Sequence, residues 1–597
     1  MDNLPKYYDK ATKFFLNEEV QKHKEALSQS AFDINLQQST VAKLVGNPLP
    51  PAINLGADVY TDIEMFTAYR DIPGATTIFK SIDNTKMLGG SLWLKNTLSS
   101  PTANVKELTI RQNEIKEFRN IWKQQKTQTT TLLETLKATE PDVLWFFSAT
   151  EEELQYLYEI VYFQSMVLFP LNRSPFALTA YNIYRIILSP LTGILSPIIY
   201  FVIPYLVLLF KYNISIGFFE YISFTVQSLI VGSDILSHLN GSFRFVKYIS
   251  MFASGLFYFQ NVFTSLDMSS LLWKLITKIY NHTNKAIEFL TSSKELLSIY
   301  GCFTDMVIPL KAHERCCFLL DHFGRQLNYF KACNRPKLCD VLKQVYEIDY
   351  KCCLMNLLQN NFELPDYVTG TTHPVISTHG LWHPSLAPHA IPNDLPKLQN
   401  TIITGPNAGG KSTLLKAVLT NLLLAQTIGV VSAKRLALTP FQFISSQISI
   451  PDCKGKESLF QAEMYRCKEK LDIVRTLPET NFMFIAMDEI FNSTNPLEGI
   501  SGAFAVLKKL TEYPNIVVMI TTHFLYLTKL KHHGFTCKKM EVVQQPDAPI
   551  KFPYKLKNGV SRQAVALELL AANGFDEDLI QTALEVKTRL STACKNP

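Results

Sequence analysis

The feature that most constrains the fold is a glycine-rich segment that follows a short apolar run. Residues 401–413 read Thr-Ile-Ile-Thr-Gly-Pro-Asn-Ala-Gly-Gly-Lys-Ser-Thr, and Gly405 to Ser412 fill the pattern G-x-x-x-x-G-K-[ST]. Such a loop turns backbone N–H groups toward phosphate oxygens, and a helix that begins at Lys411 directs its positive N-terminus to the same place. We expect Lys411 to reach the β- and γ-phosphates of a nucleotide, and Ser412 to complete a Mg²⁺ shell. The residues expected to contact the nucleotide are Gly405, Pro406, Asn407, Ala408, Gly409, Gly410, Lys411, Ser412 and Thr413.

Two further segments place polar residues directly after apolar runs. Residues 482–489 read Phe-Met-Phe-Ile-Ala-Met-Asp-Glu, which is typical of a buried parallel strand that ends in two acids. We expect Asp488 to hold Mg²⁺ and Glu489 to polarise the attacking water. A strand over 516–520 precedes His523, which we expect near the γ-phosphate or that water. The alternatives are a solvated acidic pair and a histidine that serves only packing or the surface.

Strand and helix patterns alternate from residue 399 onward. The predicted strands and helices are, in chain order, 400–404, 412–426, 441–449, 461–476, 482–488, 498–512 and 516–521. This alternation implies a doubly wound α/β sheet that binds its ligand at the carboxyl ends of the strands. Residues 56–360 are predominantly helical in pattern, and residues 1–55 form a short helical lead-in.

In this order the motifs resemble those of the MutS family of DNA mismatch-repair ATPases. Residues 404–413 are close to that family's phosphate loop, and residues 487–490 and 521–523 match its Walker B and histidine segments. Residues 456–464, Lys-Glu-Ser-Leu-Phe-Gln-Ala-Glu-Met, resemble the family's signature loop. The resemblance implies an ABC-related P-loop ATPase in which Ser458 reaches the nucleotide of the partner subunit.

The likeness extends outside these motifs. Residues 81–94, Ser-Ile-Asp-Asn-Thr-Lys-Met-Leu-Gly-Gly-Ser-Leu-Trp-Leu, are similar to the start of the family's helical core, or lever, domain. His383 and Pro384 resemble the strand that opens its ATPase domain, and residues 554–586 resemble its helical dimerisation element. The implied domains are a lead-in, a lever domain with an apolar insertion at about 186–266, an ATPase domain and a dimerisation element, over 1–55, 56–360, 361–552 and 553–597.

The chain departs from the family in two places. After Glu489 the family usually has a Gly-Arg-Gly turn, whereas here Phe491-Asn492-Ser493 stands close behind it. About 55 residues precede the lever match, and they contain no Phe-x-Glu, the wedge with which full-length repair proteins read a mismatch. The chain therefore resembles a short MutS-like form without the mismatch-reading and connector domains.

Composition argues against a globally basic surface and a cysteine metal site. The net charge is +6, with 58 basic and 52 acidic residues, so DNA contact requires local clusters. One candidate cluster, which also fits an ordinary solvated face, comprises Lys529, Lys531, His532, His533, Lys538 and Lys539. All 11 cysteines fall at or after Cys302 without a C-x-x-C spacing, which favours reduced, buried thiols. Without a signal segment near Met1, we expect an intracellular protein with its ATPase on the cytosolic side.

An uncharged stretch interrupts the helical region. Residues 186–210 contain no charged residue over 25 positions, which is long enough for a bilayer span. Prolines recur in it every seven residues, at 190, 197 and 204, and would bend a helix repeatedly. Two weaker stretches follow at 214–233 and 248–266. We expect either membrane attachment through 186–210 and a second stretch, with an even number of crossings, or a buried helical bundle.

Together the patterns favour a MutS-like protein that hydrolyses ATP as a homodimer. Two subunits would close around two ATP molecules with Mg²⁺, and hydrolysis would release the closed state. Lys411, Glu489 and His523 are the expected catalytic residues. The expected partner is DNA, in repair or recombination, without mismatch specificity. The alternative is a membrane-tethered, ATP-driven mechanical or scaffold protein that has no DNA substrate.

Overall fold

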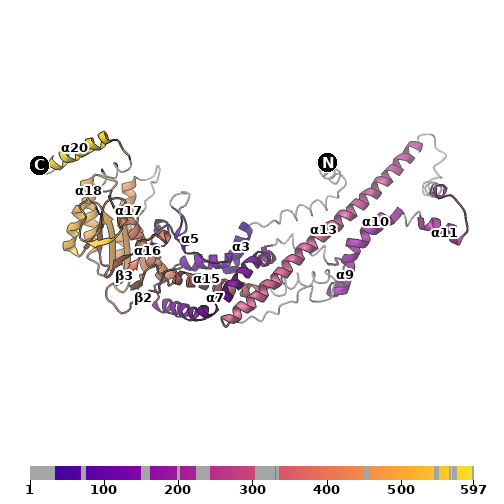
Figure 1. Ribbon diagram of the computed structural model, residues 1–597, viewed down its shortest axis with the longest axis horizontal. Helices are drawn as coiled ribbons and strands as arrows, with labels where there is room; N and C mark the ends of the chain where they lie inside the picture. The colour runs from indigo at the N-terminus through magenta and orange to yellow at the C-terminus, as the bar shows by residue number, and fades with distance from the viewer. Residues whose placement is uncertain are drawn as a thin grey trace. The chain divides into compact units, whose positions relative to one another are not determined.

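The computed structural model divides the chain into two compact units. One comprises residues 1–44 with 131–342, and the other comprises residues 45–130 with 343–597. Figure 1 shows the helices and strands of both units, and the domain boundaries given above stay a prediction. The structure describes residues 34–68, 76–148, 162–197, 202–222, 243–302, 330, 335–448, 458–543, 550–563, 567, 570 and 574–593.

A mostly parallel sheet organises the second unit. Among the described residues it has seven strands, in the order β1-β7-β8-β9-β5-β10-β11. Its neighbouring strands are parallel except β10 and β11, which are antiparallel. The strands are β1 (Asn54–Leu55), β5 (Thr401–Thr404), β7 (Phe443–Gln447), β8 (Met483–Asp488), β9 (Ile516–Thr522), β10 (Thr536–Met540) and β11 (Leu556–Asn558). Strand β1 belongs to the predicted lead-in, so a distant upstream segment completes one edge of the sheet.

Helices follow three of these strands as the sequence predicts. They are α16 (Lys411–Thr427), α17 (Leu459–Thr476) and α18 (Pro496–Leu510). Helix α18 begins where the Asn495 side chain accepts a hydrogen bond from the Leu497 N–H and Pro496 occupies the first turn. The predicted alternation of strands and helices is confirmed to within a few residues, although residue 449 lies outside the described residues.

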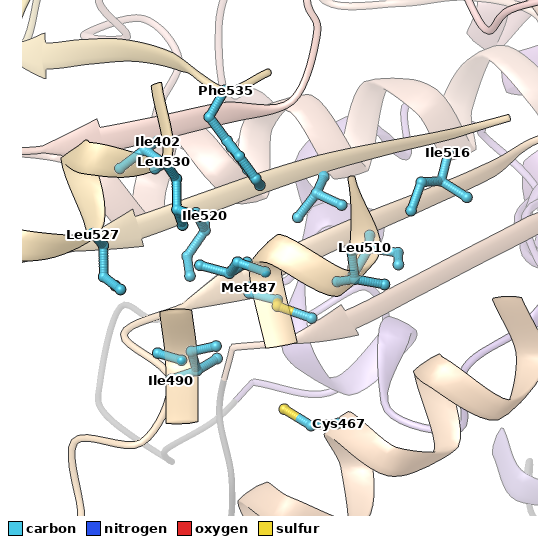
Figure 2. Packing of buried hydrophobic residues seen from close by; sticks show 14 of the residues in the cluster. Ile402, Cys467, Met487, Ile490, Leu510, Ile516, Ile520, Leu527, Leu530 and Phe535 are labelled. Atoms are coloured by element: carbon cyan, nitrogen blue, oxygen red, sulfur yellow. The ribbon is translucent and has the colours of Figure 1, made fainter. Parts of the chain in front are cut away.

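One hydrophobic cluster packs α17 and α18 against the sheet. In Figure 2, Met487 of β8 and Ile520 of β9 lie close to Leu510 of α18 and to Ile490, which follows β8. Strands β5 and β9 are buried along their whole length and β8 along nearly all of it, which explains their nearly continuous apolar sequences. This core fixes the carboxyl ends of β5, β8 and β9, where the predicted site residues begin.

A smaller sheet lies in the same unit. Its order is β2-β6-β3-β4, formed by β2 (Asp366–Tyr367), β3 (Ile376–Leu381), β4 (Asn393–Leu395) and β6 (Arg435–Leu438). His383 lies two residues after β3, and Pro384 begins the 3₁₀ helix η7 (Pro384–Leu386), so both residues lie outside the strand that the resemblance implies. The segment between β3 and β4 forms one wall of the site described below.

The double glycine in the segment that resembles the lever domain has a packing role. The double glycine lies on α6 (Leu88–Leu98). The helices before and after it in the sequence are α4 (Val59–Asp62), α5 (Ile78–Ile82) and α7 (Val105–Ser148), and α6 packs against α15 (Arg335–Gln359). A Cβ on Gly89 would lie 2.2 Å from the Tyr346 ring, and one on Gly90 would lie 2.2 Å from Asp349 Oδ2. Asp349 Oδ2 also accepts a hydrogen bond from the Met87 N–H at the start of α6, at 2.9 Å. Glycine is needed here because helices α6 and α15 approach so closely.

Helices also make up the described part of the first unit. They include α3 (Ile34–Val45), η1 (Phe169–Arg173), α9 (Pro175–Ile183), η2 (Tyr184–Leu188), α10 (Ser189–Pro197), α11 (Ile203–Lys211) and α13 (Phe243–Ile299). Side-chain hydrogen bonds join α13 to the segment before it: Ser269 Oγ donates to Ile186 O at 2.6 Å, and Tyr258 Oη donates to Ile194 O at 3.1 Å.

The prediction of a bilayer span over 186–210 is not supported. The described residues of this segment lie in η2, α10 and α11, and Pro204 stands in the first turn of α11. Within the described ranges, no helix combines the length and the apolar character that a membrane crossing needs. Residues 198–201 and 223–242 lie outside those ranges.

Candidate functional site

The phosphate loop connects β5 to α16 through residues with left-handed backbone. Ala408 has a φ of +64° and Gly410 a φ of +86°. Side chains have little room here: a Cβ on Gly409 would lie 2.9 Å from the Pro406 carbonyl oxygen, and one on Gly410 would lie 3.0 Å from the Tyr554 ring. The glycines therefore supply both conformation and space, and the N-terminus of α16 is presented at the carboxyl edge of the sheet.

Lys411, the first residue of α16, is buried among oxygen atoms. Its Nζ donates hydrogen bonds to the carbonyls of Gly405 at 3.0 Å and Pro406 at 3.2 Å. It also lies 3.4 Å from Asn407 Oδ1 and 3.3 Å from Glu489 Oε1. An ammonium has three hydrogens to donate, so these four oxygens compete for it. Phosphate oxygens brought to the loop would compete in the same way.

Asp488 ends β8 and receives hydrogen bonds from two hydroxyl groups. One comes from Thr521 on β9, which donates to Oδ1, and the other comes from Ser412 on α16. Burial raises the pKa of Asp488, and the two hydroxyls partly offset this effect. Carboxylate and hydroxyl oxygens suit Mg²⁺. Within the described ranges no group of three or more His, Cys, Asp or Glu could hold a metal alone.

Glu489 adopts a φ of +47°, and polar groups from three segments surround its carboxylate. Its N–H donates to Thr521 O at 3.0 Å, which ties the residue to the end of β9. Asn492 Nδ2 donates to Oε2 at 3.0 Å, and His523 Nδ1 lies 3.6 Å from the same oxygen, which is longer than a good hydrogen bond. His523 first, and then Lys411, lower the pKa of Glu489 against the effect of burial. The carboxylate is therefore held in its charged, proton-accepting form.

These side chains line a cavity of about 890 Å³. Its lining includes the predicted loop residues Pro406 to Thr413 together with Asp488 and Glu489. Gly405 and His523 are not part of the lining, although both contact residues that are. The structure thus brings the two predicted acids and the phosphate loop into one cavity.

The cavity has a second wall that no sequence pattern predicts. This wall comes from the segment between β3 and β4, which includes His383 and His389, and from Met540 and Tyr554. His383 and Tyr554 were singled out only through the family resemblance. No local pattern predicts that residues before and after the phosphate loop in the sequence line the same cavity.

His383 is buried in this wall. Its Nδ1 lies 2.8 Å from Ser385 Oγ, and burial together with the nearby Lys416 lowers the pKa of His383 to about 4. The imidazole is therefore neutral near pH 7, so His383 adds no positive charge to the cavity.

Ser458 caps α17 and lies outside the cavity of its own chain. Its Oγ accepts a hydrogen bond from the Gln461 N–H at 3.3 Å, and Gln461 Oε1 accepts one from the Ser458 N–H at 3.0 Å. This reciprocal capping box explains why α17 begins here. Residues 456 and 457 of the signature loop lie outside the described residues, and the role of Ser458 toward a partner subunit stays a prediction.

Comparison with known proteins relates the region that contains most of these residues to a family. Residues 401–591 match the model of the family described as MutS domain V. This match supports the predicted resemblance to the MutS family. It is 27% identical over 292 residues to the DNA mismatch repair protein MutS of Persephonella marina, covering 47% of this chain and 30% of that protein. It is 26% identical over 262 residues to the DNA mismatch repair protein MSH3 of Saccharomyces cerevisiae, covering 40% and 24%.

A second bacterial MutS gives the same result. The DNA mismatch repair protein MutS of Pseudothermotoga lettingae is 31% identical over 221 residues, which cover 36% of this chain and 26% of that protein. The chain thus spans about a quarter to a third of the length of the curated relatives it matches. The predicted resemblance to the MutS family is confirmed, and the matched part of the chain is related to DNA mismatch-repair proteins.

Proposed function

We propose that this MutS-family chain is a P-loop ATPase with a doubly wound sheet, and that it binds and hydrolyses ATP at the loop after β5. The observation that carries the proposal is the contact of Lys411 with Glu489 at 3.3 Å, inside the cavity that the phosphate loop lines. A lysine, a serine hydroxyl and two carboxylates at one sheet edge are the groups that this reaction needs.

Ser412 and Asp488 are the residues that would hold Mg²⁺. Their oxygen atoms already hydrogen-bond each other, so the donor set fits a hard cation that takes its other ligands from phosphate and water. When bound, Mg²⁺ neutralises charge on the phosphate oxygens. Titration with Mn²⁺ in the presence of ADP, followed by the paramagnetic signal of the free ion, should show one site per chain that Asp488→Asn weakens.

Glu489 is the proposed acceptor of the proton from the attacking water. The water oxygen forms a bond to the γ-phosphorus, the bond from that phosphorus to the β–γ bridging oxygen breaks, and the water proton moves to the Glu489 carboxylate. The lowered pKa of Glu489 keeps this carboxylate charged before the reaction. His523, which contacts Glu489 rather than the cavity, orients and stabilises it.

In the proposed homodimer, each ATP site takes residues from both subunits, and the dimer binds DNA. Ser458 is exposed and is not part of the cavity lining of its own chain, which suits a role in the partner's site. The exposed Leu579 and Val586 lie on α20 (Glu577–Ala593), the helix predicted to serve dimer contact. The relatives are DNA mismatch-repair proteins, so DNA is the proposed partner, in repair or recombination.

The decisive experiment measures ATP binding by calorimetry and ATP turnover by phosphate release, with and without duplex and branched DNA. We expect binding with Mg²⁺, turnover that rises with protein concentration as dimers form, and DNA affinity that falls steeply with salt. No affinity for adenine nucleotides would refute the site. Binding and turnover without any response to DNA would refute only the DNA part.

A further inference from the structure

The turn that follows Glu489, residues 490–493, is packed tightly between α17 and α18. Phe491 is 5% exposed, and its ring centroid lies 5.7 Å from that of Phe460 on α17. On α18, a Cβ added to Gly499 would lie 2.4 Å from the Phe491 carbonyl oxygen. A Cβ added to Gly502 would lie 3.5 Å from the Phe491 ring. Both helices therefore determine where the 490–493 turn lies.

The backbone of this turn is strained. Phe491 has a φ of +58°, a left-handed conformation that bulky residues rarely adopt. Such a conformation is unfavourable and persists only where the surrounding packing requires it. The strained residue lies two positions after Glu489.

Two polar side chains of the turn point to different partners. Asn492 Nδ2 donates to Glu489 Oε2 at 3.0 Å, so it contacts the proposed proton acceptor directly. Ser493 Oγ donates to Glu463 Oε2 at 3.0 Å. Glu463 is a buried residue of α17, and it also accepts a hydrogen bond from the Phe491 backbone. The turn thus joins Glu489 on one side to α17 on the other.

We propose that Asn492, and Ser493 acting through Glu463, are positioning residues that set the orientation of the Glu489 carboxylate from helix α17. This inference rests on the proposed ATP hydrolysis. Phosphate oxygens compete with Glu489 for Lys411, so the hydrogen bond from Asn492 keeps the carboxylate in place when that ion pair weakens.

The same contacts connect the turn to the proposed partner site. Helix α17 begins at Leu459, directly after Ser458, and carries Glu463 one turn later. A displacement of Ser458 by a partner subunit would be transmitted through Glu463 and Ser493 to the turn, and through Asn492 to Glu489. Contact of Ser458 with a partner subunit would in this way affect Glu489 of the same chain.

The test compares kcat, KM and ATP affinity for Asn492→Ala, Ser493→Ala and Glu463→Leu. Misplacing a catalytic group by a fraction of an ångström lowers kcat, so we expect losses of about 10-fold, 3-fold and 3-fold, with KM within about twofold of wild type. Ser493→Thr and Glu463→Gln keep a donor and an acceptor, and should restore most of kcat. Ser501→Ala, an exposed serine on α18, is the matched control and should leave kcat unchanged.

The outcomes separate this inference from the proposed function. Wild-type turnover with unchanged kcat in Asn492→Ala and Ser493→Ala would overturn the positioning role and leave the ATPase standing. Losses of kcat that follow the melting temperature, without recovery in Ser493→Thr or Glu463→Gln, would also overturn it, because the contacts would then be only structural. A wild-type chain that neither binds nor hydrolyses ATP would remove both.

Discussion

The loop after β5 and the 490–493 turn after β8 reach the same ion pair from opposite sides, and they are built in different ways. The phosphate loop adopts left-handed backbone at Gly410 and at the small Ala408. The 490–493 turn adopts it at Phe491, a bulky residue. The first conformation follows from local residue choice, whereas the second is maintained by packing against α17 and α18.

This difference has a functional consequence. A loop specified by its own residues keeps its geometry whatever its neighbours do, which suits a fixed phosphate site. A turn maintained by two helices changes when either helix moves, which suits a group whose orientation is to be regulated. The Lys411–Glu489 ion pair joins the loop after β5, which is fixed by its own residues, to the 490–493 turn, which depends on the two helices.

Removing the lysine tests the fixed part and should have the largest effect. Lys411→Ala deletes the ammonium that the loop carbonyls and Glu489 share, and we expect ATP affinity to fall at least about a hundredfold. Calorimetric titration with ATP and Mg²⁺ measures it. Wild-type affinity in this variant would show that the loop does not bind phosphate through Lys411.

Removing the charge of the Glu489 carboxylate tests the side of the ion pair that the 490–493 turn holds. Glu489→Gln keeps the size of the side chain but removes its capacity to take a proton, so kcat should fall about 10²- to 10³-fold while ATP still binds. Gel filtration with ATP should then show a persistent dimer. Full turnover in this variant would assign the proton transfer to another group.

The buried His383 in the cavity wall should make the stability of the chain depend on pH. His383 has a pKa near 4 in the folded chain and an ordinary value of 6.5, so between these values the unfolded chain binds more protons. Stability should therefore rise as the pH increases from about 4 to 6.5, by about 3 kcal/mol at most. His383→Gln should flatten this rise in urea unfolding, whereas His389→Gln, at an exposed histidine, should not.

Two substitutions of Phe491 should differ slightly in stability if the backbone of the 490–493 turn is strained. Phe491→Ala and Phe491→Gly both lose the contact with Phe460, and only the glycine relieves the left-handed strain. We expect Phe491→Gly to be as stable as Phe491→Ala or more stable, by up to about 1 kcal/mol, the reverse of their usual order. Chemical denaturation of both variants measures the difference. A clearly less stable glycine variant would contradict the strained turn.

Prediction from the sequence succeeded where residue type dictates local geometry. The strand and helix order from 399 onward follows from apolar runs and helical spacing, and Lys411 lies at a helix start because the glycines before it allow the turn. It gained no support over 186–210, where hydropathy alone indicated a span, because no helix of the described residues is long and apolar enough to cross a membrane.

Contacts between distant segments could not be predicted in the same way. The pairing of β1 with β7, the cavity wall at His383 and Tyr554, and the hydrogen bond from Ser493 to Glu463 each join residues without a local pattern. Ser458 illustrates the limit: the sequence singled it out by resemblance, and the structure gives it a helix-capping role within its own chain.

The glycine-rich loop, the two acids after β8 and the α/β alternation could be predicted from the sequence, because they depend on backbone conformation and hydrophobic periodicity over a few residues. The contacts of Glu489 could not. Its surroundings come from α16, from the end of β9 and from a turn packed between two helices. Side-chain packing across such distances is a property of the folded chain.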